Sequence, residues 1–277
     1  MCWLTCLISI LVFGSMATAA DKTPRIVECT ADALILRLTC ERVTWDQLQQ
    51  PGNSFEKLLD GIATNKTEQF LALLVRPGSR PLFRIARKTA MDRSVDVGYD
   101  VDEPVGSAKP NSPRFGFPPE DHAGDKKPLY FECRSNQVFF VDREGLEKQI
   151  LPHWNQGSRG VHPAVLPKLF STIAIEITNT YYNVLPNYLL ALILALELKP
   201  GVNGDDTEQL KHHDCLYRKV LSKFNAHNYY IDFLVRDDGF AVFRQARLIA
   251  EDNRFETGWV PMSDDVIKWA YAADPVY

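Results

Sequence analysis

Three pairs of arginines recur at matching positions in the two halves of this chain, and their side chains could bind anions. Residues 73–99, LLVRPGSRPLFRIARKTAMDRSVDVGY, align without a gap with residues 233–259, FLVRDDGFAVFRQARLIAEDNRFETGW, at an offset of 160. The paired arginines are Arg76 with Arg236, Arg84 with Arg244, and Arg87 with Arg247. A guanidinium group binds a carboxylate or phosphate through two parallel hydrogen bonds, so these six residues are the candidate binding residues.

A structural role is the alternative for the arginines within the predicted helices. On a helix with about 100° per residue, Phe83, Ala86 and Ala90 form an apolar stripe, with Arg87 at its border and Arg84 further round. The second half repeats this layout. An arginine at such a border can cover the edge of the core with its aliphatic stem and pair with a nearby carboxylate.

The repeated acids Glu28 and Glu132 are the partners expected for Arg87 and Arg247. Each acid precedes a cysteine in a second alignment, at an offset of 104, between residues 26–36 and 130–140. Repeated charges of opposite sign on neighbouring elements favour an ion pair in each half. The sequence leaves open whether these arginines stabilise the fold or bind a ligand.

Other reactive side chains do not form a recognisable catalytic or metal-binding pattern. His212-His213-Asp214-Cys215 has suitable metal-ligand types, but neighbouring residues on a helix point about 100° apart and cannot easily hold one ion. The sequence contains no G-x-S-x-G motif and no P-loop. We therefore predict no catalytic residue, no metal site and no cofactor.

Composition fits a globular protein and argues against nucleic-acid binding. The 277 residues suffice for two domains with their own cores. Hydrophobic residues make up 45% and charged residues 24%, within the ordinary globular range. The net charge of −4 gives no basic footprint for a phosphate backbone.

The first twenty residues indicate export. They carry no charged side chain and end in Ala17-Thr18-Ala19, a pattern typical of signal-peptidase sites. The n-region lacks Lys and Arg, and the alternative is an uncleaved membrane anchor. Both readings place the rest of the chain in the periplasm or cell envelope. Cleavage of the leader leaves four cysteines, Cys29, Cys40, Cys133 and Cys215. Two of them could form one disulfide, and the alternative is that all four are buried thiols.

The alternation of apolar segments predicts an α+β fold built from two copies of one small module. Each copy reads as a hairpin, a helix, a strand, a helix and a last strand. In the first copy these are residues 25–30 with 33–38, 45–63, 70–75, 80–93 and 95–101. In the second they are residues 129–134 with 137–142, 207–224, 230–235, 240–254 and 255–260.

The expected organisation is a leader, two modules and a linker. Residues 1–20 form the signal peptide or anchor, 21–103 the first module, 104–127 a Pro- and Gly-rich linker, and 128–277 the second module. The second module carries a mostly helical insertion at about residues 145–206, in which the apolar run from Tyr188 to Leu196 reads as a buried or partner-facing helix. A final helix over Val266 to Ala272 is expected after the cap-like Ser263-Asp264-Asp265.

This order of elements resembles the periplasmic domain of the ExbD/TolR biopolymer-transport family. VECTADALILRLTCERVTWDQL is similar to the family's opening hairpin and first helix, and FLVRDDGFAVFRQARLIAEDNRFETGWVP to its later strand, turn, helix and final strand. Arg236 and Asp238 match the family's turn. The resemblance covers most of both halves, outside the linker and the insertion.

The departures from the family limit what the resemblance implies. Family members carry an acidic residue in an N-terminal membrane helix, and residues 1–20 contain none, so proton conduction does not follow. The expectation is a non-catalytic cell-envelope binding or scaffold protein, whose partner is an envelope protein of an ExbB/TolQ-like transport system or a cell-wall component. The alternative is a hydrolase-type enzyme with a site between the modules and the insertion as its lid.

Overall fold

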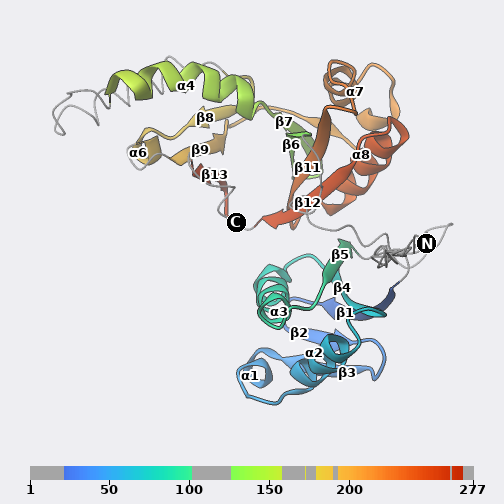
Figure 1. Cartoon of the computed structure of the whole chain (residues 1–277). Coiled ribbons are helices and arrows are strands. Elements are labelled where there is room, and N and C mark those ends of the chain that lie inside the picture. The colour runs from blue at the N-terminus through green and yellow to red at the C-terminus, as the bar shows by residue number, and fades with distance from the viewer. Residues whose placement is uncertain are drawn as a thin grey trace, which may run out of the picture.

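The computed structural model describes residues 22–101, 126–157, 172, 179–189, 193–262 and 264–270. Helices combine with mixed parallel and antiparallel sheets, which confirms the α+β class. The described strands form two five-stranded sheets and one three-stranded sheet. Figure 1 shows the three-stranded sheet beside the second five-stranded sheet. The predicted leader at 1–20 and most of the predicted linker at 104–127 lie outside the described residues. Within the described part, no helix has the length and apolar character needed to cross a membrane.

The first sheet has the strand order β3-β2-β1-β4-β5. Its strands are β1 (Thr23–Cys29), β2 (Ala33–Leu36), β3 (Glu41–Thr44), β4 (Gln69–Val75) and β5 (Val97–Val101). The pairs β1–β2 and β2–β3 are antiparallel, whereas β1–β4 and β4–β5 are parallel. Its helices are α1 (Trp45–Leu48), α2 (Ser54–Thr64) and α3 (Arg80–Asp92). Parallel neighbours need a crossover connection, which α3 supplies between β4 and β5.

Local sequence sets where these helices begin. The side chain of Asn53 accepts a 3.0 Å hydrogen bond from the backbone N–H of Glu56 and caps α2. Pro81 lies in the first turn of α3, where a missing N–H removes no helical hydrogen bond. The helix predicted over residues 45–63 is divided into α1 and α2, with Gly52 at a φ of 75° between them.

The second sheet repeats the topology of the first, in the order β10-β7-β6-β11-β12. Its strands are β6 (Lys127–Arg134), β7 (Gln137–Val141), β10 (Asp205–Asp206), β11 (Tyr229–Arg236) and β12 (Thr257–Met262). The pairs β6–β7 and β7–β10 are antiparallel, and β6–β11 and β11–β12 are parallel. Its helical elements are the short 3-10 helix η3 (Gln209–Lys211), α7 (Leu216–Leu221) and α8 (Phe240–Asp252).

The strand register is also the same in both sheets. Cys29 faces Val75 across the β1–β4 pair, and Cys133 faces Val235 across β6–β11. The outer parallel pairs agree as well, with Leu71 opposite Val97 in one sheet and Ile231 opposite Thr257 in the other. These are the residues that the two sequence offsets relate. The shared register is what a duplicated module requires.

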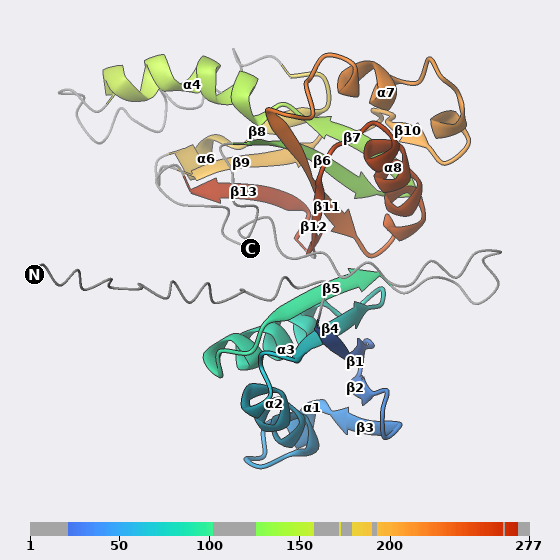
Figure 2. The same ribbon diagram turned by 45° about the vertical axis from the view of Figure 1, so that its right-hand side comes forward.

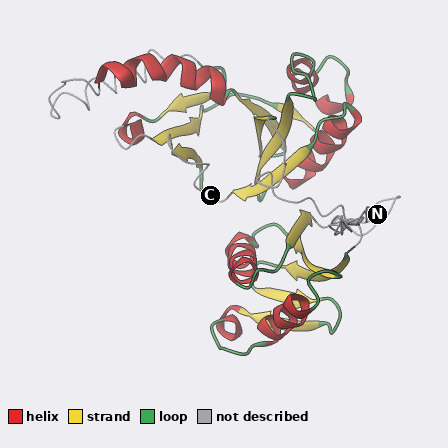
Figure 3. Cartoon of the chain, viewed as in Figure 1, coloured by secondary structure: helices red, strands yellow, loops and turns green. Residues whose placement is uncertain are grey.

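Helices cover one face of each sheet, and the two cores meet. Figure 3 shows the helices of the first unit beside its sheet, and Figure 2 shows α8 close to β11 and β12. On α3 the predicted stripe of Phe83, Ala86 and Ala90 is buried. Buried side chains from both units, including Tyr99 and Trp259, join into one cluster. The two units therefore pack through apolar side chains and not only through a chain connection.

The insertion builds a second layer on the opposite face of the second sheet. Between β7 and β10 lie α4 (Arg143–Gly157), β8 (Tyr182–Val184), α6 (Pro186–Leu189) and β9 (Ile193–Leu198). The later strand β13 (Val266–Ala270) joins them in a small antiparallel sheet of order β13-β9-β8. Trp269, Tyr182 and Leu234 are among the side chains of the core between the two sheets. The described insertion therefore holds strands as well as helices.

Three expected helices are wrong in whole or in part. The apolar run from Tyr188 to Leu196 is divided between α6 and β9, because Ile193 onward pairs with β13. Of the helix expected over residues 266–272, the described residues 266–270 form the strand β13, in which Ile267 and Trp269 are buried in the core. The helix expected over 207–224 is reduced to η3 and α7. The short strands β3 and β10 were not expected.

Candidate functional site

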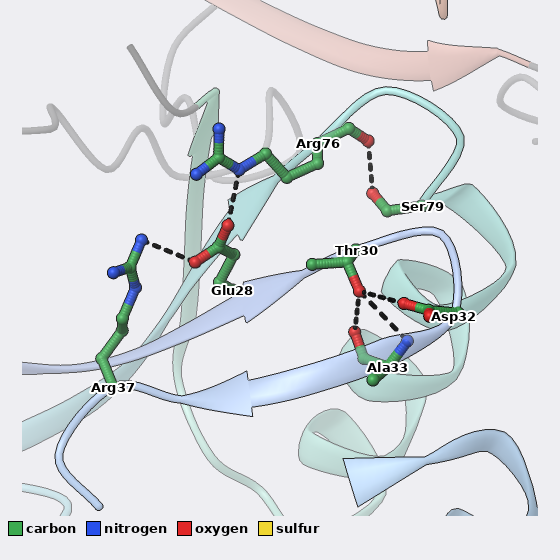
Figure 4. A network of polar contacts seen from close by, with 7 residues as sticks. All are labelled: Glu28, Thr30, Asp32, Ala33, Arg37, Arg76 and Ser79. Atoms are coloured by element: carbon green, nitrogen blue, oxygen red, sulfur yellow. Dashed lines mark hydrogen bonds and ion pairs between the residues drawn. The ribbon is translucent and has the colours of Figure 1, made fainter. Parts of the chain in front are cut away.

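Arg76 directly follows β4 and Arg236 is the last residue of β11, and the two arginines pair with equivalent acids. Figure 4 shows Arg76 Nε donating to Glu28 Oε1, at 2.6 Å, and Arg37 approaching the other carboxylate oxygen. In the second unit, Arg236 Nε donates to Glu132 Oε1 at 2.7 Å. The expected pairing of Arg87 with Glu28 and of Arg247 with Glu132 is therefore wrong. The acids lie at the strand ends, where the strand arginines reach them first.

The second of these pairs lies deep inside the protein. The side chains of Arg236 and Glu132 are only 6% and 1% exposed. The Tyr182 hydroxyl, from the insertion, donates to Glu132 Oε2 at 2.8 Å. Burial, followed by the Glu132 charge, raises the pKa of Tyr182 well above its usual value. Arg236 Nη2 lies 2.7 Å from Glu132 Oε1 outside hydrogen-bonding geometry, and Nη1 has no partner among the described residues. This pair is structural, because no ligand can reach it directly.

Arg247 and Arg87 both act at the contact between the two units. Arg247 Nη1 donates to Asp100 Oδ1 of β5 at 2.7 Å, and its Nε donates to Glu251 at 2.9 Å. Burial lowers the pKa of Arg247, but the charges of Asp100 and Glu251 outweigh it and leave the pKa raised. Arg87 lies 6.0 Å from the ring centre of Tyr99, within the range of a cation–π contact. Both arginines lie at the core edge, as the structural interpretation predicts.

Arg84 and Arg244 differ although their positions match. Arg244 is half-buried on α8, whereas Arg84 is exposed on α3. Within the described residues, the side chain of Arg84 forms no hydrogen bond or ion pair. Of the six predicted arginines, Arg84 is the most exposed, so its side chain is the most accessible to a ligand.

Arg84 opens into a hollow of about 530 Å³ between the two units, which we call the arginine groove. Its walls are the outer face of α3, Trp45 at the start of α1, and two residues of β12. The lining residues are Trp45, Arg80, Pro81, Phe83, Arg84, Ile85, Arg87, Lys88, Met91, Asp92, Val260 and Pro261. Trp45 and Met91 expose 45% and 54% of their surfaces, so apolar surface is open to solvent beside the charges.

The charge of the arginine groove is strongly positive. It contains three arginines and Lys88, whereas its one carboxylate, Asp92, pairs with Lys88 at 2.6 Å. Arg80 is only 11% exposed at its side chain and lies 4.0 Å from Asp264. Burial, and then the charge of Arg84, lower the pKa of Arg80. The cations repel one another here, which favours a bound anion.

The repeated residues of the sequence do not indicate Arg80 and Trp45. The counterpart of Arg80 in the second unit is Phe240, and Trp45 lies in a segment that the two alignments do not include. The signal was present in the first unit alone, where arginines stand at residues 80, 84 and 87. Spacings of four and three place them along one side of a helix.

The remaining reactive groups do not assemble into a second kind of site. Cys29, Cys133 and Cys215 are buried and Cys40 is exposed, and all four are free thiols. No three metal-ligating side chains converge within the described part of the chain. His212 and His213 are exposed in the turn before α7. Comparison with family models, with curated proteins and with solved structures gives no match for this chain.

Proposed function

We propose that this chain is a non-catalytic binding or scaffold protein of the cell envelope, whose arginine groove takes an anionic group with an apolar neighbour. The observation that carries the proposal is the arginine groove itself. Three arginines face one paired carboxylate, beside the exposed rings and methyl groups of Trp45 and Met91. Guanidinium groups at such a site favour carboxylate or phosphate groups.

The position of the groove supports a binding role. Its two walls belong to different units, which are held together by the Arg247–Asp100 ion pair and by buried aromatic rings. A ligand in the groove would contact both units. The predicted export leader and the resemblance to ExbD/TolR domains favour a partner in the envelope, either an ExbB/TolQ-like transport system or the cell wall.

The lining of the arginine groove does not favour the alternative of a hydrolase-type enzyme. That alternative needs acids, histidine or cysteine converging between the units and the insertion as a lid. Among the described residues, the lining contains no histidine, no cysteine and nothing from the insertion, and its only acid is the paired Asp92. The insertion instead packs on the far face of the second sheet.

Co-sedimentation with isolated cell wall, and affinity capture from an envelope extract, test the proposal. We expect the protein to bind one of these, and Arg84→Glu to reduce binding at least about fivefold, because it reverses a charge that makes no internal contact. Lys57→Glu is the matched control. Lys57 is exposed on α2, and its replacement reverses one charge, as Arg84→Glu does, at a place outside the groove. Equal binding by Arg84→Glu and the parent, or no specific binding by the parent, would overturn the proposal.

A further inference from the structure

A second basic hollow lies in the second unit, away from the arginine groove. Its volume is about 660 Å³, and it is formed by the end of α7, the loop to β11 and the turn between α8 and β12. The lining residues are Lys126, Arg218, Leu221, Ser222, Phe224, Asn225, Ala226, His227, Asn253, Arg254 and Phe255. Within the described part of the chain, this lining includes three cations and a histidine but no carboxylate. We call it the α7 corner.

The same corner of the first unit is neutralised from within. In the first unit, α2 takes the place of α7 before the strand β4, which corresponds to β11. Arg93 lies in the turn after α3, which corresponds to the turn after α8. Arg93 Nη2 lies 2.8 Å from Glu56, and its Nε lies 3.5 Å from Asp60. In the second unit, α7 supplies Arg218 in place of such acids. The strand topology is the same around both corners, but the acids that pair with Arg93 in the first unit have no counterpart in the lining of the second.

The cations of the α7 corner have few internal partners. Arg254 is exposed, and its side chain forms no hydrogen bond or ion pair with any described residue. Among the described residues, the side chain of Arg218 donates one long hydrogen bond, of 3.4 Å, to the carbonyl oxygen of Leu210. Lys126 pairs with Glu256, which lies outside the lining. Among the described residues, Glu256 is therefore the one carboxylate paired with any of the three cationic side chains.

The fold does not require an arginine at position 254. Its counterpart in the gapless alignment is Ser94. Both residues adopt the left-handed conformation, with φ of 66° for Arg254 and 55° for Ser94. A serine therefore fits this backbone, and the arginine contributes a positive charge that the turn itself does not use.

We propose that the α7 corner binds a phosphate-bearing small molecule. Two guanidinium groups and an ammonium group around one hollow match the charge and the several acceptor oxygens of a phosphate. The volume exceeds that of a phosphate ion, and Leu221, Phe224 and Phe255 give the hollow an apolar side. The ligand is therefore an organic phosphate or a pyrophosphate. This site is separate from the arginine groove and does not depend on the function proposed for it.

Calorimetric titration of the full chain with inorganic pyrophosphate, at constant ionic strength, tests the site. We expect saturable binding that Arg254→Ser weakens about tenfold, because one charge-assisted contact is lost. Lys66→Ser removes an exposed charge from the first unit and should bind like the parent. Arg84→Ala should also bind like the parent, which separates this site from the arginine groove.

Three outcomes would overturn the inference. They are absence of saturable binding, unchanged affinity in Arg254→Ser, and a citrate affinity equal to that for pyrophosphate, which would indicate general attraction of anions. Urea unfolding of Arg254→Ser checks that the variant is folded. If it is not, Arg254→Gln serves in its place, because it removes the charge and keeps most of the side chain.

Discussion

The hydroxyl group of Tyr99 donates a 2.9 Å hydrogen bond to the backbone carbonyl oxygen of Trp259. Trp259 is the counterpart of Tyr99 in the alignment of the two units. Their ring centres lie 5.4 Å apart in an edge-on arrangement. Phe83 contacts Tyr99 on one side, and Phe243 contacts Trp259 on the other. One row of rings thus runs from the core of the first unit into the core of the second.

Removing the Tyr99 hydroxyl should loosen this contact. Tyr99→Phe leaves the carbonyl oxygen of Trp259 buried without its donor, and we expect a loss of about 1–2 kcal/mol in the free energy of unfolding. Urea unfolding followed by tryptophan fluorescence measures it. Tyr188→Phe is the control, because that hydroxyl forms no hydrogen bond with any described residue, and it should change stability by less than about 0.5 kcal/mol. Equal effects of the two variants would contradict the assignment.

The ion pair between Arg247 and Asp100 should couple the two units energetically. Their side chains are 15% and 8% exposed, so removing either leaves a charge in a poorly solvated place. Arg247→Ala should cost about 3 kcal/mol, and the double change with Asp100→Asn less than the sum of the single changes. A double-mutant cycle in urea measures the coupling. A coupling energy near zero would show that solvent screens the pair.

The repeated elements could be predicted because their signals are local. The helix over Arg80–Asp92 carries its apolar stripe and its arginines within one stretch of sequence, and the structure confirms both. The hairpins likewise follow from short turns, such as Ser135 and Asn136, which have positive φ angles of 49° and 56°. We predict that the Cα atoms of the two units superpose within about 3 Å, because the units share their topology and strand register.

The small sheet and the ion pairs could not be predicted in the same way. β9 and β13 are separated by a long stretch of chain, and each is a strand because the other pairs with it. The partner of Arg247 is Asp100 of the other unit, and the sequence of one module alone does not indicate a contact between modules. Asp100 is also not a repeated charge, because its counterpart in the second unit is Val260.

The equivalent pairs Arg76–Glu28 and Arg236–Glu132 should differ in strength. The Arg76 side chain is 35% exposed and Glu28 keeps a second partner in Arg37, whereas Arg236 is 6% exposed. We expect Arg76→Ala to cost at most about 1 kcal/mol, and Arg236→Ala about 3 kcal/mol. Thermal and urea unfolding of the two variants measure this difference. Similar costs would mean that burial does not set the strength of these pairs.

The buried thiols should make the protein sensitive to alkali. Burial, and then the charge of Glu132, raise the pKa of Cys133 well above the ordinary value of 9.0, and Cys29 is affected in the same way beside Glu28. Below the ordinary value both states hold the proton, so the thiols add no pH dependence. Above it the unfolded chain loses its protons first, so stability falls as the pH rises.

Cys133→Ala should therefore reduce this loss of stability. One thiol contributes up to about 1.4 kcal/mol per pH unit, so the free energy of unfolding should decline less steeply in the variant between about pH 9 and pH 10.5. The cavity left by the sulfur lowers stability at every pH and does not alter the slope. Urea unfolding under reducing conditions, at several pH values, measures the slope. Cys40→Ala is the control, because Cys40 is exposed and its replacement should leave the slope unchanged. If Cys133→Ala also declined in parallel with the parent, Cys133 would not be the source of the alkaline sensitivity.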